Sequence, residues 1–328
     1  MFRAPGQGAP RRWGLWWLEA GGCAILRARE EAALYTYHQK RMIAGYVFIS
    51  PWVIGFLVFV VGSLLASLFL SFTNWNALST PQFIGLKNYA KLFFDDPLFW
   101  KSVKVTALYS LSIPLNLVFG LLIAVLLNQK IKGLGIFRTI YYLPSVIVGV
   151  AVSLLWVWIF NPRFGIFNLF LAQVFGIQGP AWLADETWVI PALIIMSLWG
   201  VGGPMLIYLA ALQNVPTSYY EAAIVDGANA WQRFLKITVP MISPVILFNL
   251  IMGIIQSFQV FTPAYVMTDG GPNHGSLMYV LYLYRHAFQW YRMGYAAAQA
   301  WLLFVLILAM TLVVLRSSAA WVYYESRK

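Results

Sequence analysis

The sequence predicts an all-α polytopic membrane protein with six transmembrane helices. Hydrophobic residues make up 61% of the chain and charged residues only 10%, whereas a soluble domain carries roughly 25% charged residues. Mean hydropathy is +0.71, and several apolar runs exceed the roughly 18 residues that cross a bilayer. These runs are continuous rather than alternating, which argues against a transmembrane β-barrel. The single cysteine, Cys23, excludes a disulfide framework and a cysteine-based metal cluster.

The six expected spans follow one another from the first third of the chain to its end. A proline at position 51 is expected to begin or kink the first span. In the fourth span, the run from Gly200 to Pro204 predicts a bend. The segment LMYVLYLYRHAFQW between the last two spans is too short to cross, and its pattern leaves open an interfacial or a buried helix. The spans cover approximately residues 44–72, 105–127, 138–160, 188–212, 241–262 and 295–317.

Residues 1–41 differ from the rest of the chain and are expected to form a poorly constrained N-terminal extension, ahead of a transmembrane domain at 42–328. The opening segment mixes Arg, Gly, Pro and clustered Trp, and Glu19 interrupts its apolar stretch. It lacks a clear small-residue cleavage site, which argues against a signal peptide. An amphipathic interfacial helix is the alternative.

The net charge of +11 reflects membrane topology rather than nucleic-acid binding, because the basic residues flank apolar spans. With both termini in the cytoplasm, fifteen Lys and Arg residues lie on the cytoplasmic side and seven on the other. We therefore expect a multi-pass protein of the cytoplasmic membrane with both ends inside.

A polar stretch, EAAIVDGANAWQRFLKITVP at residues 221–240, separates spans four and five. Ser218 and Glu221 have the spacing of a capping box, which predicts a helix start after Pro216. Gly227 is a natural helix stop, because a positive φ is required there. A second helix is expected to run to Pro240, so that residues 217–240 form a helical hairpin at the membrane surface.

The spacing of Glu221, Gly227, Ile237 and Pro240 resembles the EAA loop of binding-protein-dependent ABC importer permeases. Val239 stands where that family usually has Leu. The resemblance runs from about residue 42 to the end of the chain. Within the family, the sequence is similar to the carbohydrate-importing branch, of the maltose and glycerol-3-phosphate type. It includes FIGLKNYAKLFFDDPLFW at 83–100, the segment at 126–160, and the loop TDGGP at 268–272.

The resemblance implies a type I importer architecture and a set of partners. The EAA loop would form the coupling helix that docks on an ATP-binding subunit, which is present in two copies. A second permease subunit would complete a heterodimer, and an extracytoplasmic solute-binding protein would dock on the outer face, with membrane lipid around the spans and no nucleic acid. The implied coupling residues are Glu221, Ala222, Ala223, Asp226 and Gly227, and the implied outer docking loop is Asp269, Gly270, Gly271 and Pro272.

The energy source is expected on another chain. By these boundaries the spans contain no Asp, Glu or His to carry protons or cations. The chain also lacks the G-x-x-x-x-G-K-[ST] phosphate loop of an ATPase. We therefore expect no cofactor and no metal in this chain, with ATP and Mg²⁺ bound by the partner ATPase.

Uncharged polar groups in span five are candidates for a sugar path, because amides and hydroxyls hydrogen-bond sugar hydroxyls. Their alternative role is to hydrogen-bond neighbouring helices. Span five offers Asn249, Gln256, Ser257 and Gln259. The resemblance implies contacts at Gly253, Ser257 and Val260, and at Trp199 and Gly200 of span four.

Two other classes of function remain as alternatives. A membrane enzyme requires clustered His or carboxylate groups, but His38, His274 and His286 are scattered, and Asp95-Asp96 before Pro97 has the pattern of a solvated turn. The second alternative is a self-sufficient secondary carrier or channel for a small polar solute. Transport by the chain alone would favour it.

Overall fold

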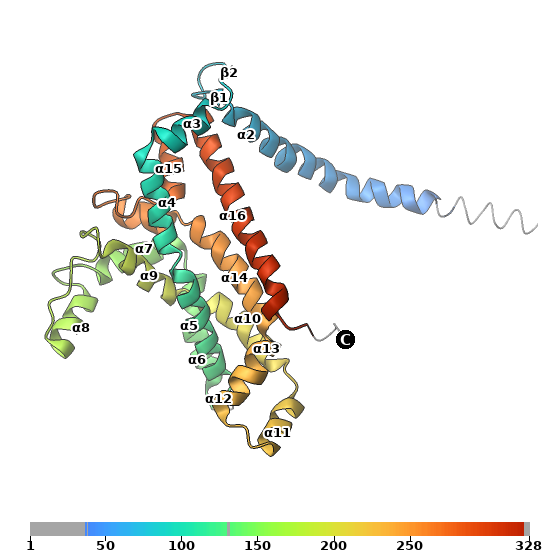
Figure 1. The fold of residues 1–328 in the computed structure, drawn as a ribbon, viewed down its shortest axis with the longest axis vertical. Coiled ribbons are helices and arrows are strands. Elements are labelled where there is room, and N and C mark those ends of the chain that lie inside the picture. The colour runs from blue at the N-terminus through green and yellow to red at the C-terminus, as the bar shows by residue number, and fades with distance from the viewer. Residues whose placement is uncertain (1–36, 38, 130–131, 325–328) are drawn as a thin grey trace, which may run out of the picture. The chain divides into compact units, whose positions relative to one another are not determined.

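A computed structural model describes residues 37, 39–129 and 132–324 of the chain (Figure 1). The chain divides into two compact units, Met1–Ala66 and Ser67–Lys328. In the first unit, residues 39–66 belong to the apolar helix Gln39–Ser71, in which Pro51 lies well inside rather than at the start. Most of the predicted N-terminal extension lies outside the described residues.

Within the described residues, three helices are long and apolar enough to cross a membrane, and three bent helix pairs raise the number to six if each pair is one span. This arrangement confirms the predicted all-α polytopic class. The elements are η1 Phe56–Gly62, α2 Ser63–Ser71, β1 Thr73–Asn74, β2 Gln82–Phe83, α3 Lys87–Phe94, α4 Pro97–Tyr109, α5 Ser112–Leu127, α6 Leu134–Val146, α7 Gly149–Ile159, α8 Ile166–Phe175, α9 Val189–Trp199, α10 Gly202–Gln213, α11 Thr217–Val225, α12 Ala230–Arg233, η2 Phe234–Thr238, α13 Val239–Met241, α14 Ser243–Phe258, η3 Ala264–Thr268, α15 Tyr279–Tyr284, η4 Arg285–Gln289 and α16 Met293–Trp321, where η marks a wide π-type turn.

The bends lie where the sequence interrupts helical hydrogen bonding. The predicted bend of the fourth span is present, since α9 and α10 meet at 46° across Gly200. The third span bends by 101° between α6 and α7, which the sequence analysis did not predict. There Pro144 removes one backbone donor near the end of α6, and the β-branched residues Ile147 and Val148 adopt extended backbone angles.

Helices of the second unit approach closely where glycine faces a neighbour. A Cβ atom added to Gly202 of α10 would lie 2.7 Å from the carbonyl oxygen of Tyr141 in α6. A Cβ added to Gly253 of α14 would lie 3.2 Å from Cγ2 of Ile113 in α5. Small residues at such crossings permit the dense packing that holds membrane helices together.

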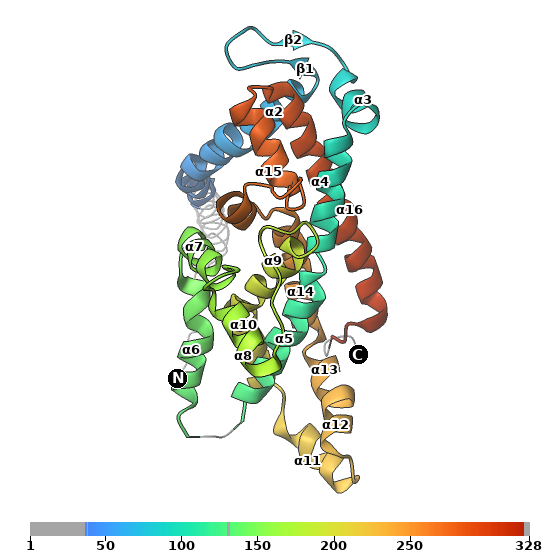
Figure 2. The same ribbon diagram turned by 90° about the vertical axis from the view of Figure 1, so that its left-hand side faces the viewer.

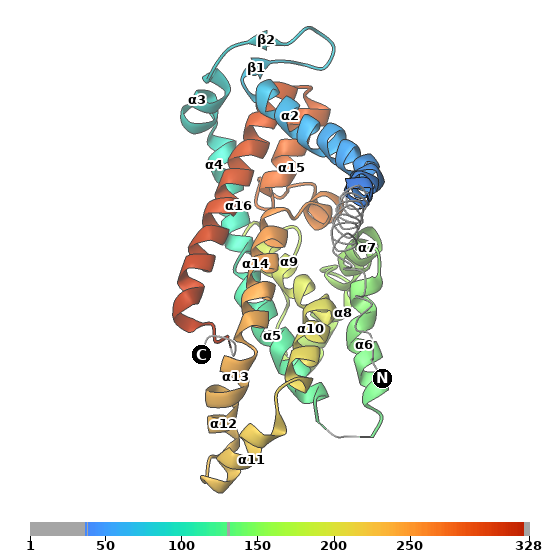
Figure 3. The same cartoon turned by 90° about the vertical axis from the view of Figure 1, so that its right-hand side faces the viewer.

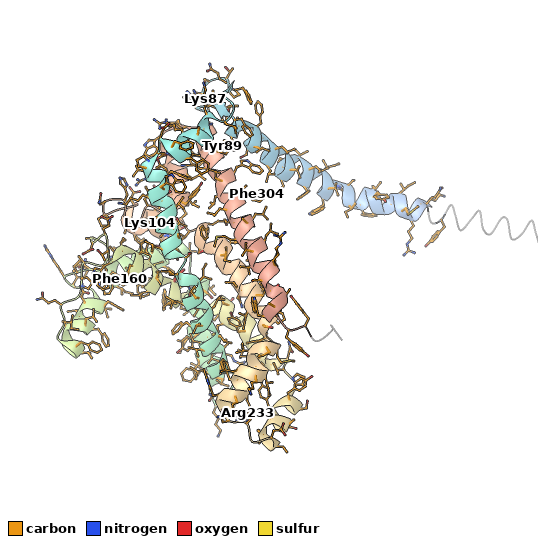
Figure 4. All side chains as sticks on the ribbon, viewed as in Figure 1. Lys87, Tyr89, Lys104, Phe160, Arg233 and Phe304 are labelled. Atoms are coloured by element: carbon orange, nitrogen blue, oxygen red, sulfur yellow. The ribbon has the colours of Figure 1, made fainter. Side chains whose placement is uncertain are left out.

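The second unit has two distinct ends (Figures 2 and 3). Helices α11 and α12 form one end, here called the hairpin end, and the β1–β2 pair with α3 forms the other, here called the α3 end. Figure 4 shows Arg233 at the hairpin end and Lys87 at the α3 end. The C-terminal segment returns toward α14, because the Tyr323 amide donates a hydrogen bond to Ser243 Oγ at 2.8 Å.

The short segment that the sequence left ambiguous is a buried helix. Helix α15 and turn η4 pack between α4 and α16, and Leu277 and Leu281 have no exposed surface. The Tyr279 amide also donates a hydrogen bond to Thr106 Oγ1 of α4 at 2.9 Å. This packing matches the partly buried helix of the two alternatives.

Candidate functional site

A cavity of about 380 Å³ lies among α5, the α9–α10 bend and α14. Its walls include Gly200 and Gly203 at the bend and Gly253 on α14, and a Cβ added to Gly203 would meet no atom within 4 Å. None of the described residues that line it is charged. Its polar lining consists of Tyr109, Ser112, Asn116, Ser197, Asn249, Gln256 and Ser257.

The side-chain amides that line this cavity differ in whether they already form hydrogen bonds within the protein. Asn116 donates hydrogen bonds to the Ser112 carbonyl at 2.9 Å and to Ser197 Oγ at 3.0 Å, which ties α5 to α9. The Asn249 amide lies near the Tyr208 hydroxyl, yet the Asn249 Nδ2 atom forms no hydrogen bond of ordinary geometry. Gln256 is exposed to the cavity. A polar solute in the cavity would therefore meet donors and acceptors without any charge.

The structure brings together five of the eight residues named for the substrate path. Gly200, Asn249, Gly253, Gln256 and Ser257 line the cavity. The others lie outside its lining: Trp199 packs edge-to-face on Trp156, with 6.0 Å between ring centroids, while Gln259 and Val260 follow the end of α14. The role of all eight residues in a path stays a prediction.

Sequence reasoning missed the contribution of the second span and of Ser197. The missed polar residues are Tyr109, Ser112, Asn116 and Ser197. One signal was present, because Asn116 is the only amide side chain in the apolar run 105–127. An isolated amide in a membrane span is costly unless it has a partner or a function.

The first helix of the EAA hairpin (residues 217–240) ends as Gly227 predicts. Gly227 has φ +76°, and the Ala228 amide donates to the Ala223 carbonyl at 2.8 Å while the Gly227 amide donates to the Ile224 carbonyl at 3.0 Å. These two bonds form a Schellman motif. Ala223 and Gly227 therefore fix the corner of the hairpin.

The predicted capping box at Ser218 and Glu221 is wrong. Helix α11 begins at Thr217 behind the extended residue Pro216, with no side-chain cap. Ser218 thus lies inside the first turn, where its hydroxyl cannot act as the cap. The capping box lies at the second helix instead. There the backbone N–H of Gln232 donates to Asn229 Oδ1 at 2.8 Å, and the backbone N–H of Asn229 donates to Gln232 Oε1 at 2.9 Å.

The second arm of the hairpin does not stop at Pro240, as the sequence predicted, but continues to Met241. The wide turn η2 ends at Thr238, two residues before Pro240, and such turns accommodate a missing backbone donor. The Tyr220 and Thr238 hydroxyl oxygens lie 2.9 Å apart and join the two arms.

The tip of the hairpin exposes an apolar patch beside charged groups. The exposed fraction reaches 88% for Val225 and 66% for Trp231. Glu221 and Asp226 are also exposed. An apolar surface with a charged rim is suited to docking against another protein.

The loop Asp269–Pro272 lies at the opposite end of α14 from the hairpin and is held by side chains from other elements. Arg285 Nη2 donates to the Asp269 carbonyl at 2.6 Å and pairs with Asp269 Oδ1 at 3.0 Å. Gly270 has φ +77° and is buried, so the turn needs glycine there. The role of the loop in docking stays a prediction.

Asn273, the residue after this loop, is held by Lys101 and Glu186, and these three residues are here called the polar clamp. Lys101 Nζ of α4 pairs with Glu186 Oε1 at 2.9 Å and donates to the Asn273 carbonyl at 2.5 Å, and Asn273 Nδ2 donates to Glu186 Oε2 at 2.8 Å. The hydrogen bonds from Lys101 and Asn273 lower the pKa of Glu186. The clamp therefore joins α4, the segment before α9 and the 269–276 loop.

This fold, with broken membrane-spanning helices around an uncharged polar cavity and a protruding helical hairpin, defines a permease subunit of a membrane transporter. Residues 116–327 match the family described as "Binding-protein-dependent transport system inner membrane component". The chain belongs to this family, and it is a permease subunit of an ATP-driven importer of the ABC class.

Several known proteins are similar over most of the chain. The probable ABC transporter permease protein YesP of Bacillus subtilis (strain 168) is 48% identical, over 88% of this chain and 95% of that protein. The trehalose/maltose transport system permease protein MalF of Thermococcus litoralis is 32% identical, over 83% and 92%. A chain in the crystal structure of a bacterial alginate ABC transporter, in complex with an alginate pentasaccharide-bound periplasmic protein, has a TM-score of 0.75 and 27% identity, over 85% and 95% of the two chains.

Proposed function

We propose that this permease subunit imports a carbohydrate and transmits ATPase motion through the EAA hairpin. The observation that carries the proposal is the cavity between α5, the α9–α10 bend and α14, which is polar but uncharged. Hydroxyl-rich solutes suit such a lining, because amides and hydroxyls both donate and accept hydrogen bonds. The names of the similar permeases, which include trehalose, maltose and lactose systems, support the same substrate class.

The EAA hairpin is the proposed contact with the ATPase. Its corner is rigid, since the Schellman motif at Ala223–Gly227 and the Tyr220–Thr238 contact fix both arms. Its tip presents Val225 and Trp231 to a partner surface. A rigid projection of this kind transmits a displacement to α10 and α14, the helices on either side of it, which together carry one wall of the cavity.

This proposal places the hairpin end in the cytoplasm and the α3 end outside, with both termini cytoplasmic. The two ATP-binding subunits, with their ATP and Mg²⁺, would bind at the hairpin end beneath a heterodimer of this chain and a second permease. An extracytoplasmic solute-binding protein would dock near the Asp269–Pro272 loop. The excess of Lys and Arg on the cytoplasmic side supports this orientation.

Purification of the tagged chain from its native membrane tests the partner set. We expect mass spectrometry to identify a P-loop ATPase and a second permease that remain bound. The recovered complex, reconstituted in proteoliposomes with its binding protein, is then assayed for ATP-dependent uptake of maltose, trehalose, lactose and alginate oligosaccharides. ATP-dependent uptake of at least one of them is the expected result.

Two results would contradict the proposal in different ways. Uptake by the chain alone, without ATP, would establish the self-sufficient carrier instead. An ATP-driven complex that takes up none of these saccharides but accumulates another class of solute would retain the importer and reject the carbohydrate.

A further inference from the structure

A second cavity, of about 360 Å³, lies at the α3 end of the chain, between α3, η4 and the start of α16. It shares no lining residue with the translocation cavity. Its wall combines charged groups with aromatic rings and an imidazole. The residues that carry the argument are Lys91, Asp95, Asp96, His286, Trp290 and Arg292.

The floor of this cavity is rigid because Asp96 joins three helices. Asp96 Oδ1 accepts the Phe99 amide at 3.0 Å, which caps α4. The Tyr282 hydroxyl of α15 donates to both carboxylate oxygens, at 2.8 and 2.7 Å, and the Tyr295 hydroxyl of α16 donates to Oδ2 at 2.5 Å. Burial and the bond to Asp96 raise the pKa of Tyr282, so this phenol stays protonated and keeps donating.

His286 is buried against this floor without a hydrogen-bond partner. Its exposed fraction is 3%, and the rings of Tyr282, Trp290 and Tyr295 pack around it with centroid distances of 4.6, 4.5 and 4.5 Å. Neither Nδ1 nor Nε2 has a partner. Burial lowers the pKa of His286 to about 4, so the ring is neutral at pH 7. A neutral imidazole offers one donor and one acceptor, and both are unused here.

The rim offers further charged groups, of which Lys91 Nζ lies 5.8 Å from the ring centroid of Tyr295. Among the described residues, neither Lys91 nor Arg292 forms a salt bridge, since the pairs found are Lys101–Glu186 and Arg285–Asp269. The exposed Asp95 carboxylate adds an acceptor, and Trp290 exposes 44% of its surface. Two cationic groups, Lys91 and Arg292, and the carboxylates of Asp95 and Asp96 line the same cavity. Because their charges balance, the cavity does not favour binding of a simple anion or a simple cation.

We infer that this cavity is a second saccharide-binding site, which contacts sugar hydroxyl groups through His286, Lys91 and Arg292 and a sugar ring through Trp290. A hydroxyl group both donates and accepts, so it matches the two unused nitrogens of a neutral imidazole and the mixed rim. The C–H face of a sugar packs on an exposed indole ring. The inference rests on the proposed carbohydrate function, and it places the site on the side where the binding protein would deliver its cargo.

Nitrogen-15 NMR of histidine in the assembled transporter, embedded in nanodiscs, tests this site directly. The chain has only three histidines, and the spectrum of a His286→Phe sample identifies the signals of His286. The probes are the saccharides of the uptake assay: maltose, trehalose, lactose and alginate oligosaccharides. We expect the saccharide that is imported to move the His286 imidazole signals saturably, because a hydroxyl group in the cavity forms a hydrogen bond with the imidazole.

Substitutions at the rim identify the binding groups without removing the buried histidine. Trp290→Leu and Lys91→Gln are each expected to raise at least tenfold the saccharide concentration that gives half of the saturable shift. Lys87→Gln is the matched control, because Lys87 is exposed one turn away on the same helix α3 and does not line the cavity. The control should leave the shift unchanged.

The outcomes separate this inference from the proposed function. If the transporter imports a saccharide that leaves the His286 signals unmoved, that saccharide does not bind in this cavity and the inference is wrong. A shift that persists in both rim variants likewise rejects it, since the saccharide would then act from another site. Absence of any saccharide uptake counts against the proposed function instead, and a saccharide shift in such a sample would still support binding here.

Discussion

The hydroxyl oxygens of Tyr220 and Thr238 lie 2.9 Å apart and join the two arms of the EAA hairpin. Thr238 is buried and Tyr220 is half-buried, so the contact is largely shielded from water. Hydrogen bonds of this kind contribute about 1 kcal/mol each to the free energy of unfolding. The contact ties the two arms to each other, as the proposed transmission of force requires.

Replacement Thr238→Val should therefore loosen the hairpin while keeping the shape of the side chain. We expect ATP hydrolysis by the complex to continue and uptake per ATP hydrolysed to fall several-fold. Parallel assays of uptake and hydrolysis in proteoliposomes measure this ratio. Thr217→Val, at an exposed position in the same hairpin, is the control. An unchanged ratio in Thr238→Val would show that the contact is not needed for coupling.

Replacement Gly227→Asp is expected to abolish coupling without preventing membrane insertion. An added Cβ meets no atom within 4 Å, so the change costs backbone strain at φ +76°, about 1 kcal/mol, and adds a carboxylate to the hairpin tip. Gly133→Asp is a matched control, because Gly133 also has a positive φ of 84° and open surroundings. Normal ATP-dependent uptake by Gly227→Asp would sink the coupling role of the hairpin.

Two glutamines on span five should differ in their importance for substrate. Gln256 lines the translocation cavity and Gln259 does not. Gln256→Leu is expected to raise the half-saturating saccharide concentration severalfold, because the cavity loses an amide that can both donate and accept. Gln259→Leu should have little effect on the same uptake curve. Equal effects of the two changes would mean that the path is not the cavity described here.

Much of the fold follows from the sequence because apolar length and glycine or proline breaks are local signals. The bend at Gly200 and the helix stop at Gly227 were both readable in this way. The 101° bend at Ile147–Val148 was not, since β-branching lowers helix propensity only slightly and packing routinely overrides it. The burial of α15 also depends on its packing between α4 and α16, which no local pattern encodes.

The candidate sites were less predictable because they gather residues from distant segments. Asn249 and Gln256 were found from one helix face, whereas Asn116 and Ser197 join them only through the packing of α5 against α9. The turn predicted at Asp95-Asp96 holds for Asp95, which is exposed. Asp96 instead accepts bonds from Tyr282 and Tyr295, almost two hundred residues further along the chain.

Loss of the Asp96 carboxylate should destabilise the α3 end of the protein. Asp96→Ala removes a helix cap worth about 1 kcal/mol and leaves two phenols without their charged acceptor, at about 1.5–3 kcal/mol for each such bond. We expect a clear fall in the unfolding temperature of the purified complex. Asp95→Ala, at the exposed neighbouring carboxylate, should leave that temperature nearly unchanged. Equal melting of the two variants would argue against Asp96 as the joint of α4, α15 and α16.

The Lys101–Glu186 pair gives a pH-dependent prediction whose sign follows from the direction of the shift. The hydrogen bonds from Lys101 and then Asn273 lower the pKa of Glu186 below its ordinary value of 4.5. A group whose pKa is lower in the folded state stabilises the fold above the ordinary pKa, and that contribution disappears as the pH falls through the folded-state value. The clamp should thus be complete at neutral and mildly acidic pH and open only in stronger acid.

Carbon-13 NMR of labelled glutamate carboxylates, followed over pH, measures this titration. Lys101→Gln is expected to raise the pKa of Glu186 toward its ordinary value, because it removes the largest cause of the shift. Lys104→Gln changes the charge equally one turn along α4 but forms no bond to Glu186, so it should leave the titration almost unchanged. A pKa of Glu186 that does not respond to Lys101→Gln would mean that the two side chains are not paired in the membrane-embedded protein.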